Sequence, residues 1–207
     1  IELIIICDTE NNAVRKTLKN FSKNKLKNSF IHFNKVNLGI TKSLNIGLNY
    51  ANGKFIARYD SDDLMNKNRI QNQSNFLRDN SKIDIIFTNY KIFFEKTIFS
   101  KKKKVPNNLS IIKWRMIFCN QFCHPSAMFR KKLVDDGLYR YNENYLVSQD
   151  YELWTKFIVS NINFYILEDY LYFLRIHRKS VSISKKQLQN DYSLNIGYNY
   201  LSKNIQF

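Results

Sequence analysis

Apolar residues recur with two different periods along the first half of the chain. Leu3–Cys7 is a continuous apolar run, typical of a strand covered on both faces. Ile40, Leu44, Leu48 and Ala51 recur at helical spacing, with polar residues between them. By these criteria the first half alternates strands and helices. We expect strands at 3–7, 30–33, 55–59 and 83–88 and helices at 12–22, 40–51 and 66–78; Gly53 is expected to cap the second helix.

The second half has a less regular pattern. We expect a strand or hairpin at 90–99, helices at 110–118, 149–160 and 184–204, an extended segment at 124–130, and short strands at 163–167 and 171–177. Alternating strands and helices predict an α/β fold with a mostly parallel, Rossmann-like central sheet flanked by helices. The 207 residues suit one domain, 1–207. Within it, a sheet-building half (1–105) precedes a mixed half that covers a cleft (106–184) and a basic C-terminal helix (185–207).

Basic residues outnumber acidic ones, with 33 Lys and Arg against 17 Asp and Glu and a net charge of +16. This balance is typical of proteins that meet nucleic acid, an anionic membrane or phosphate-bearing substrates. It is also what the codon usage of an AT-rich genome produces, and the sequence alone leaves both explanations open. The basic segment 185–207 either lies on an anionic bilayer or packs as an ordinary helix. Hydrophobic residues make up 44%, which excludes intrinsic disorder.

The main chemical signal is Asp60-Ser61-Asp62-Asp63, directly after a predicted strand. Three carboxylates in four residues repel one another unless they are solvated or share a cation. Ligands bind at the carboxyl ends of strands in open α/β sheets, and carboxylate oxygens suit Mg²⁺ or Mn²⁺. A solvated acidic turn ahead of the next helix is the alternative, and the pattern alone does not separate the two.

The surrounding residues resemble the family 2 glycosyltransferases, nucleotide-sugar-dependent enzymes of the GT-A fold. The family pattern is roughly N-x-G-x-x-x-[AS]-L-N-x-G followed by A-x-G-x-[YF]-I-A-x-x-D-x-D-D, and residues 37–47 and 51–63 match it closely. The resemblance continues to about residue 184, through Arg69 and Gln73, His124–Arg130, Gln149–Trp154, Tyr172–His177 and Ser180–Ser184.

The resemblance implies roles for the acidic residues. Asp60 and Asp62 would hold Mn²⁺ or Mg²⁺ against the donor diphosphate, with Asp63 in support. Asp150 would be the general base of a single displacement that inverts the anomeric configuration. Asp150 shares a helical stripe with Trp154, so we expect partial burial to raise its pKa towards the range of a working base.

The remaining candidates are less specific. Asp8 is the candidate for binding the uracil ring, because the family's usual pair of aspartates is here Cys7-Asp8. Arg58 is a candidate for the donor phosphates, and His124, His177 and Trp154 are candidates on the acceptor or diphosphate side. Each of these also has an ordinary structural interpretation. The family begins with one more strand and helix than this chain, and we expect the chain to be truncated.

The resemblance therefore predicts an enzyme that moves a sugar from a nucleotide-diphosphate sugar, with UDP favoured, to a glycan or lipid-linked glycan. The expected setting is lipopolysaccharide or capsule synthesis in a bacterium, in the cytoplasm or at the cytoplasmic face of the inner membrane, without a nucleic-acid partner. Three alternatives stay open: a nucleotidyltransferase with a similar acidic metal site, a basic nucleic-acid-binding module, and a truncated, inactive relic.

Overall fold

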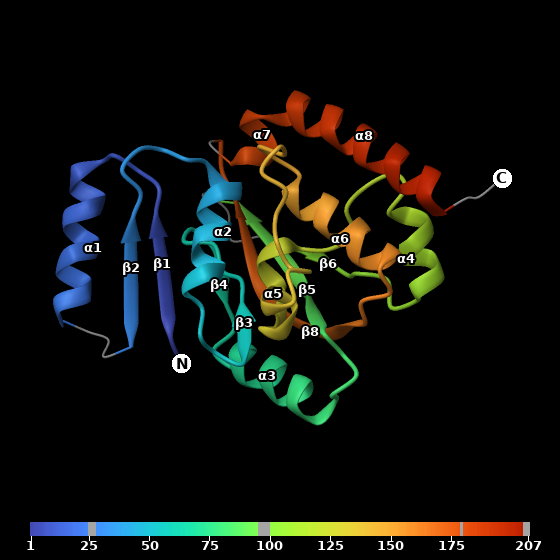
Figure 1. The fold of residues 1–207 in the computed structure, drawn as a ribbon, viewed down its shortest axis with the longest axis horizontal. Helices are drawn as coiled ribbons and strands as arrows, with labels where there is room; N and C mark the ends of the chain where they lie inside the picture. The colour runs from blue at the N-terminus through green and yellow to red at the C-terminus, as the bar shows by residue number, and fades with distance from the viewer. Residues whose placement is uncertain (25–27, 95–99, 179, 205–207) are drawn as a thin grey trace.

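Two separately hydrogen-bonded sheets with flanking helices build the protein (Figure 1). The structure is a computed structural model that describes residues 1–24, 28–94, 100–178 and 180–204. The strands are β1 (Leu3–Cys7), β2 (Ser29–Phe33), β3 (Phe55–Ala57), β4 (Leu64–Met65), β5 (Ile85–Phe94), β6 (Ser100–Lys103), β7 (Met128–Arg130) and β8 (Phe164–Ile176). The helices are α1 (Asn12–Asn24), α2 (Ile40–Tyr50), α3 (Arg69–Asp79), α4 (Leu109–Arg115), the 3₁₀ turn η1 (His124–Ser126), α5 (Lys132–Asp135), α6 (Gln149–Val159), α7 (Val181–Ser184) and α8 (Lys186–Asn204).

The predicted α/β class is confirmed, with a mixed sheet rather than a mostly parallel one. β1 and β2 pair in parallel, joined by the crossover helix α1. The larger sheet has the order β3-β7-β5-β8-β4, with β6 on β5. Only its β5–β8 pair is parallel among the described residues, and its other pairs are antiparallel. The antiparallel pairs β3–β7 and β4–β8 join segments far apart in sequence, which local periodicity does not reveal.

Helix α2 joins the two sheets. One face packs on β1, where a Cβ added at Gly47 would lie 3.3 Å from the Ile6 side chain. Leu48 and Leu44 on the helix pack with the main core. That core also holds Trp154 of α6, Ile112 of α4 and Ile196 of α8, which cover one face of the larger sheet.

Three expectations about local structure need correction. Leu3–Cys7 is buried on both faces only at its end: Cys7 is buried, whereas Leu3 is 37% exposed. Helix α2 ends at Ala51 in extended backbone, so Gly53 does not cap it. The predicted breaks within β5 and β8 are absent, because each strand runs on through a register shift near Thr88–Tyr90. Residues 95–99 of the predicted hairpin lie outside the described residues.

Helix α8 packs directly on the chain that follows α4. A Cβ at Gly197 would lie 2.1 Å from the carbonyl oxygen of Ile117. In the described parts of the chain, no helix combines the length and apolarity needed to cross a bilayer.

Candidate active site

The acidic loop, Asp60–Asp63, follows β3 at the edge of the larger sheet. The backbone N–H of Arg58 donates to the carbonyl of Ala127 at 2.9 Å, which extends the pairing of β3 with β7 towards the loop. The amide of Asp63 then closes a turn on the Asp60 carbonyl at 3.2 Å. The three carboxylates therefore stand at the carboxyl end of a strand, as predicted, although that strand pairs antiparallel.

A buried arginine, Arg69, contacts the backbone at the end of β3 and at the start of β7. Arg69 is fully buried, and its guanidinium donates to the carbonyls of Arg58 at 2.9 Å and Ala127 at 3.2 Å. Gln73 accepts from the Arg69 Nε at 2.9 Å and donates to the Ser126 carbonyl at 2.9 Å. Burial lowers the pKa of Arg69 to about 10, which leaves it charged at neutral pH. The R-x-x-x-Q motif thus fixes the strand that carries the acidic loop.

Asp63 points inward, away from solvent. It is 3% exposed, and its carboxylate accepts hydrogen bonds from the Tyr172 hydroxyl and the Arg175 backbone N–H, both at 2.7 Å. Burial raises its pKa to about 6, helped by the neighbouring carboxylates of Asp60 and Asp62, while the two hydrogen bonds act in the opposite direction. Asp63 therefore anchors the loop to β8.

The other two carboxylates each have a basic partner. Asp62 Oδ2 lies 2.9 Å from His177 Nε2, which brings together two residues 115 positions apart that the sequence singled out separately. Asp60 forms an ion pair with the Arg58 guanidinium. The Asp60 backbone N–H donates to the Tyr172 hydroxyl at 3.2 Å, so Tyr172 binds both ends of the loop.

The loop supplies an incomplete metal site. In the described residues, no group of three or more His, Cys, Asp and Glu side chains is placed to hold a metal ion. The Asp62 side chain is 48% exposed and offers carboxylate oxygens, which suit Mg²⁺ and Mn²⁺. Such an ion, bound by one or two carboxylates, completes its shell with phosphate oxygens and water. The residues therefore fit a metal that is held jointly with a diphosphate, and the Asp60 oxygen paired with Arg58 is less available to it.

Asp150 lies in the first turn of α6, after Ser148 in left-handed backbone. Its Oδ2 accepts a hydrogen bond from the Asn120 side-chain amide at 2.7 Å. Burial raises the pKa of Asp150 to about 6, against hydrogen bonds from the Tyr151 and Asp150 amides and from Asn120, and the Asp60 carboxylate raises it further. The predicted rise in pKa agrees with this result.

Two of the acceptor-side candidates are buried. Trp154 is 1% exposed and packs between Phe87, Phe122 and Tyr139, so it presents no surface to a ligand. His124 is 8% exposed, and its Nε2 lies 2.7 Å from the Tyr141 hydroxyl. Burial holds the pKa of His124 well below its usual value, with Arg58 adding to the effect, so its ring is neutral. Both residues belong to the packing beneath the site.

Asp8 connects β1 to the start of α2. Its two carboxylate oxygens accept from the backbone N–H groups of Leu38 at 2.7 Å and Gly39 at 2.8 Å. Oδ1 also accepts from the Asn34 side chain at 2.7 Å. Gly39 sits at φ +81°, a conformation that favours glycine. Asp8 thus holds the loop before α2 with both of its oxygens.

Sequence reasoning missed the residues that position these groups. Asn120, which binds Asp150, lies in a stretch with no periodic signal, and Tyr172 opens the resembling segment Tyr172–His177 but had no role of its own there. Asn45 accepts from the Tyr141 amide and donates to its carbonyl, both at 3.0 Å, which ties α2 to the loop before α6. The N-x-G…L-N spacing could have indicated Asn45, although the helical pattern places it opposite the apolar stripe, because it lies within the resembling motif; in the structure it is 1% exposed.

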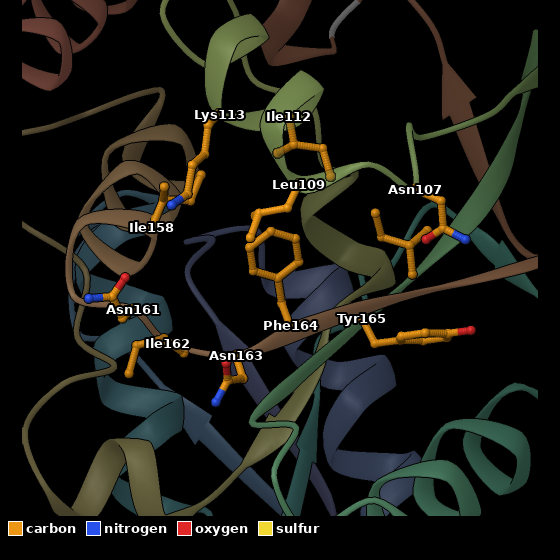
Figure 2. Close-up of a pocket in the computed structure, with 11 residues that line it drawn as sticks. Asn107, Leu109, Ile112, Lys113, Ile158, Asn161, Ile162, Asn163, Phe164 and Tyr165 are labelled. Atoms are coloured by element: carbon orange, nitrogen blue, oxygen red, sulfur yellow. The ribbon is translucent and has the colours of Figure 1, made fainter. Parts of the chain in front are cut away.

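A separate hollow of about 280 Å³ lies at the far end of α6 from Asp150. Figure 2 shows its lining, in which Lys113 and Leu109 of α4 approach Ile158 and Phe164. It contains none of the acidic residues discussed here, so it is distinct from the candidate site.

Comparisons with known proteins agree with the geometry. The family model described as Glycosyl transferase family 2 matches residues 1–138. An uncharacterized glycosyltransferase of Methanocaldococcus jannaschii is 29% identical over 92% of this chain, which spans 65% of that protein. The Escherichia coli UDP-Gal:alpha-D-GlcNAc-diphosphoundecaprenol beta-1,3-galactosyltransferase is 32% identical over 61% of this chain and 46% of its own length. The chain thus spans less than two thirds of both.

Two solved structures share the fold at low identity. Staphylococcus aureus TarS 1–349 in complex with UDP-GlcNAc superposes with a TM-score of 0.70 at 17% identity, covering 98% of this chain and 63% of that one. The mannosyltransferase PcManGT of Pyrobaculum calidifontis, in complex with GDP-Man and Mn²⁺, gives 0.63 at 11% identity, with coverages of 97% and 65%. At these identities the comparison establishes the GT-A fold.

Proposed function

The chain belongs to glycosyl transferase family 2, and on that premise we propose that it transfers a sugar from a UDP-sugar to an acceptor hydroxyl, with inversion at the anomeric carbon. The observation that carries the proposal is the Asp150 carboxylate. It is partly buried, burial raises its pKa to about 6, and the Asn120 side-chain amide donates a hydrogen bond to it at 2.7 Å. A base of this pKa is largely ionised at neutral pH and still accepts a proton readily.

The donor diphosphate lies against the acidic loop in this proposal. Asp62, with His177 beside it, would hold Mn²⁺ or Mg²⁺ together with the phosphates. Asp60 would be the second carboxylate near the ion, with one of its oxygens paired to Arg58. The ion supplies charge neutralisation for the departing diphosphate when it is bound. Asp63 and Tyr172 keep the loop in place. Asp8 shapes the nucleotide side by holding the loop before α2.

Asp150 acts on the acceptor. Its carboxylate takes the proton of the acceptor hydroxyl, whose oxygen then forms a bond to the anomeric carbon. The bond from that carbon to the phosphate oxygen breaks, and UDP leaves. Asn120 holds the Asp150 carboxylate in one orientation through a hydrogen bond of 2.7 Å. Attack from the face opposite the leaving group inverts the configuration.

The acceptor we propose is a lipid-linked glycan in the synthesis of a surface polysaccharide such as lipopolysaccharide or capsule. The galactosyltransferase relative is named for a diphosphoundecaprenol acceptor, which supports this class. The protein then works in the cytoplasm at the inner face of the membrane.

The first test is calorimetric titration of the protein with UDP, with and without Mn²⁺, and with GDP for comparison. We expect UDP binding that strengthens with Mn²⁺ and is lost in Asp62→Ala. Asp169→Ala is the matched control, because Asp169 is an exposed carboxylate on β8, outside the acidic loop. Metal-independent UDP binding, or transfer undiminished in EDTA, would refute the role of the metal. Tight binding of GDP alone would refute the choice of nucleotide.

A further inference from the structure

Helix α4 presents an apolar face to solvent. Ile111, Trp114 and Phe118 are 45%, 64% and 62% exposed, whereas Ile112 and Met116 on the opposite side are almost completely buried. The amides of Phe118 and Cys119 donate to the carbonyl of Arg115, so the helical path continues past the end of α4. The three exposed residues therefore follow the i, i+3, i+7 spacing of one helix face, which we term the α4 outer face.

The α4 outer face is unusual because it exposes the aromatic side chains of Trp114 and Phe118, while the smaller Ile112 and Met116 are buried on the opposite side. The rings of Trp114 and Phe118 contact each other, with centroids 5.0 Å apart. Burial of aromatic rings is worth more than burial of almost any other side chain, and Trp and Phe are enriched where a helix lies in a membrane interface.

The segment of chain that carries this face is basic. Residues 101–134 contain no Asp or Glu, and Lys101–Lys104 precede α4 by only a few residues. Lys113 and Arg115 on α4 are exposed, and in the described part of the chain neither forms an ion pair. An apolar helix face beside basic residues is complementary to an anionic lipid surface.

The position of this face relates it to the proposed chemistry. Phe118 is two residues from Asn120, whose amide binds Asp150 at 2.7 Å, and two residues of chain span at most about 7 Å. A surface bound at Phe118 therefore lies close to the proposed base. Helix α8 packs on the Ile117 backbone through Gly197, which fixes the segment against the domain.

From these observations we propose that the α4 outer face docks on an anionic lipid bilayer, with Trp114 and Phe118 inserted at the interface and the neighbouring Lys and Arg side chains bound to lipid phosphates. This rests on the proposed function only in one respect: docking brings a lipid-linked acceptor to Asp150. The bilayer contact itself requires no transfer activity.

Vesicle binding tests the proposal directly. We would mix the protein with vesicles of phosphatidylcholine containing about one third phosphatidylglycerol, and with vesicles of phosphatidylcholine alone, and measure the bound fraction by sedimentation. We expect binding to the anionic vesicles that weakens in high salt. Trp114→Ser/Phe118→Ser should lower the partition constant at least tenfold, because much apolar area no longer leaves water. Val36→Ser/Leu146→Ser, which removes two side chains that are each 56% exposed on other segments, should bind like the parent.

Tryptophan emission supplies a second readout. The chain has two Trp residues, and Trp154 is 1% exposed, so a blue shift on vesicle binding reports Trp114. Trp114→Phe should still bind but lose the shift. Equal binding by Trp114→Ser/Phe118→Ser, or binding without a shift, would overturn the proposal. So would dimerisation through the same residues without vesicle binding. UDP titration of the same variants separates this outcome from failure of the proposed function, since nucleotide binding does not depend on the α4 outer face.

Discussion

Replacing Asp150 with Asn should make the protein more stable and inactive at the same time. In the folded protein the pKa of Asp150 is about 6, against 3.8 for the unperturbed group. Ionising it in the folded state therefore costs about 3 kcal/mol relative to the unfolded chain once the pH is above 6. Asn carries no such cost, and it can still accept the hydrogen bond from Asn120 through its amide oxygen.

The size of the stability gain depends on pH. Because the folded-state pKa is raised, the stability that protonated Asp150 gives is present below pH 4 and is lost as the pH rises through 6. Asp150→Asn should therefore match the parent at pH 4 and exceed it by up to about 3 kcal/mol at pH 7.5. For a chain of this size that corresponds to a rise in Tm of roughly 6 to 10 °C. Asp63, whose pKa is also about 6, is present in both proteins and cancels from the comparison.

The assay pairs urea denaturation at the two pH values with sugar transfer at pH 7.5. Transfer by Asp150→Asn should fall by about 10² to 10⁴, and kcat/KM of the parent should rise through pH 6 and level off above it. Asp169→Asn, on an exposed carboxylate, should change neither quantity by a measurable amount. A variant that is less stable than the parent at pH 7.5 would refute the reasoning, because the carboxylate would then be a net structural contributor.

Four further substitutions, one of them a control, test the packing around the site. Gly197→Ala should destabilise the protein by about 1 to 3 kcal/mol, although Ala has the better helix propensity, because the added Cβ would lie 2.1 Å from the Ile117 carbonyl oxygen. Gly47→Ala is the control: its Cβ would meet only the Ile6 side chain, so its free energy of unfolding should stay within about 1 kcal/mol of the parent's in the same urea series. Arg69→Lys should cost about 2 kcal/mol and weaken UDP binding, because one ammonium cannot replace the guanidinium on two backbone carbonyls; calorimetry showing parental stability and affinity would contradict the supporting role. Tyr172→Phe should raise the pKa of Asp63 above 6 by removing a hydrogen bond to its carboxylate, which NMR titration of the Asp63 carboxyl carbon would measure; an unchanged pKa would count against the anchor.

The sequence predicted the local elements better than the way they pair. Helical spacing in residues 40–51 and the apolar run at 3–7 located α2 and β1, because both signals are local. The antiparallel partner of β3 lies more than 70 residues further along the chain, and no period within β3 encodes it. The half-exposed state of β1 is likewise a property of how the sheets meet.

The site shows the same division. The acidic loop and Asp150 are candidates because segments that resemble the family contain them, and the helical stripe added only the expected burial of Asp150. Trp154 is buried, and the sequence left its place open because an aromatic residue at helical spacing has the same pattern in a core as at a sugar site. Asn120 and Tyr172 could not be predicted, since their roles arise only when α6 and β8 are packed beside the loops they contact.

The way α2 joins the two sheets has a consequence for how the protein opens. In the described residues no backbone ladder connects β1 and β2 to the larger sheet, so α1, β1 and β2 depend on side-chain packing against α2 and on the Asp8 contacts. Regions held by few buried contacts exchange their amide hydrogens through local opening, ahead of global unfolding. The β1 and β2 amides should therefore exchange faster than those of β5. A nucleotide that contacts both the β1–β2 sheet and the larger sheet should slow the exchange of the β1 and β2 amides. Part of the response to donor binding would then be slower hydrogen exchange in α1, β1 and β2, because they open less often from the rest of the protein.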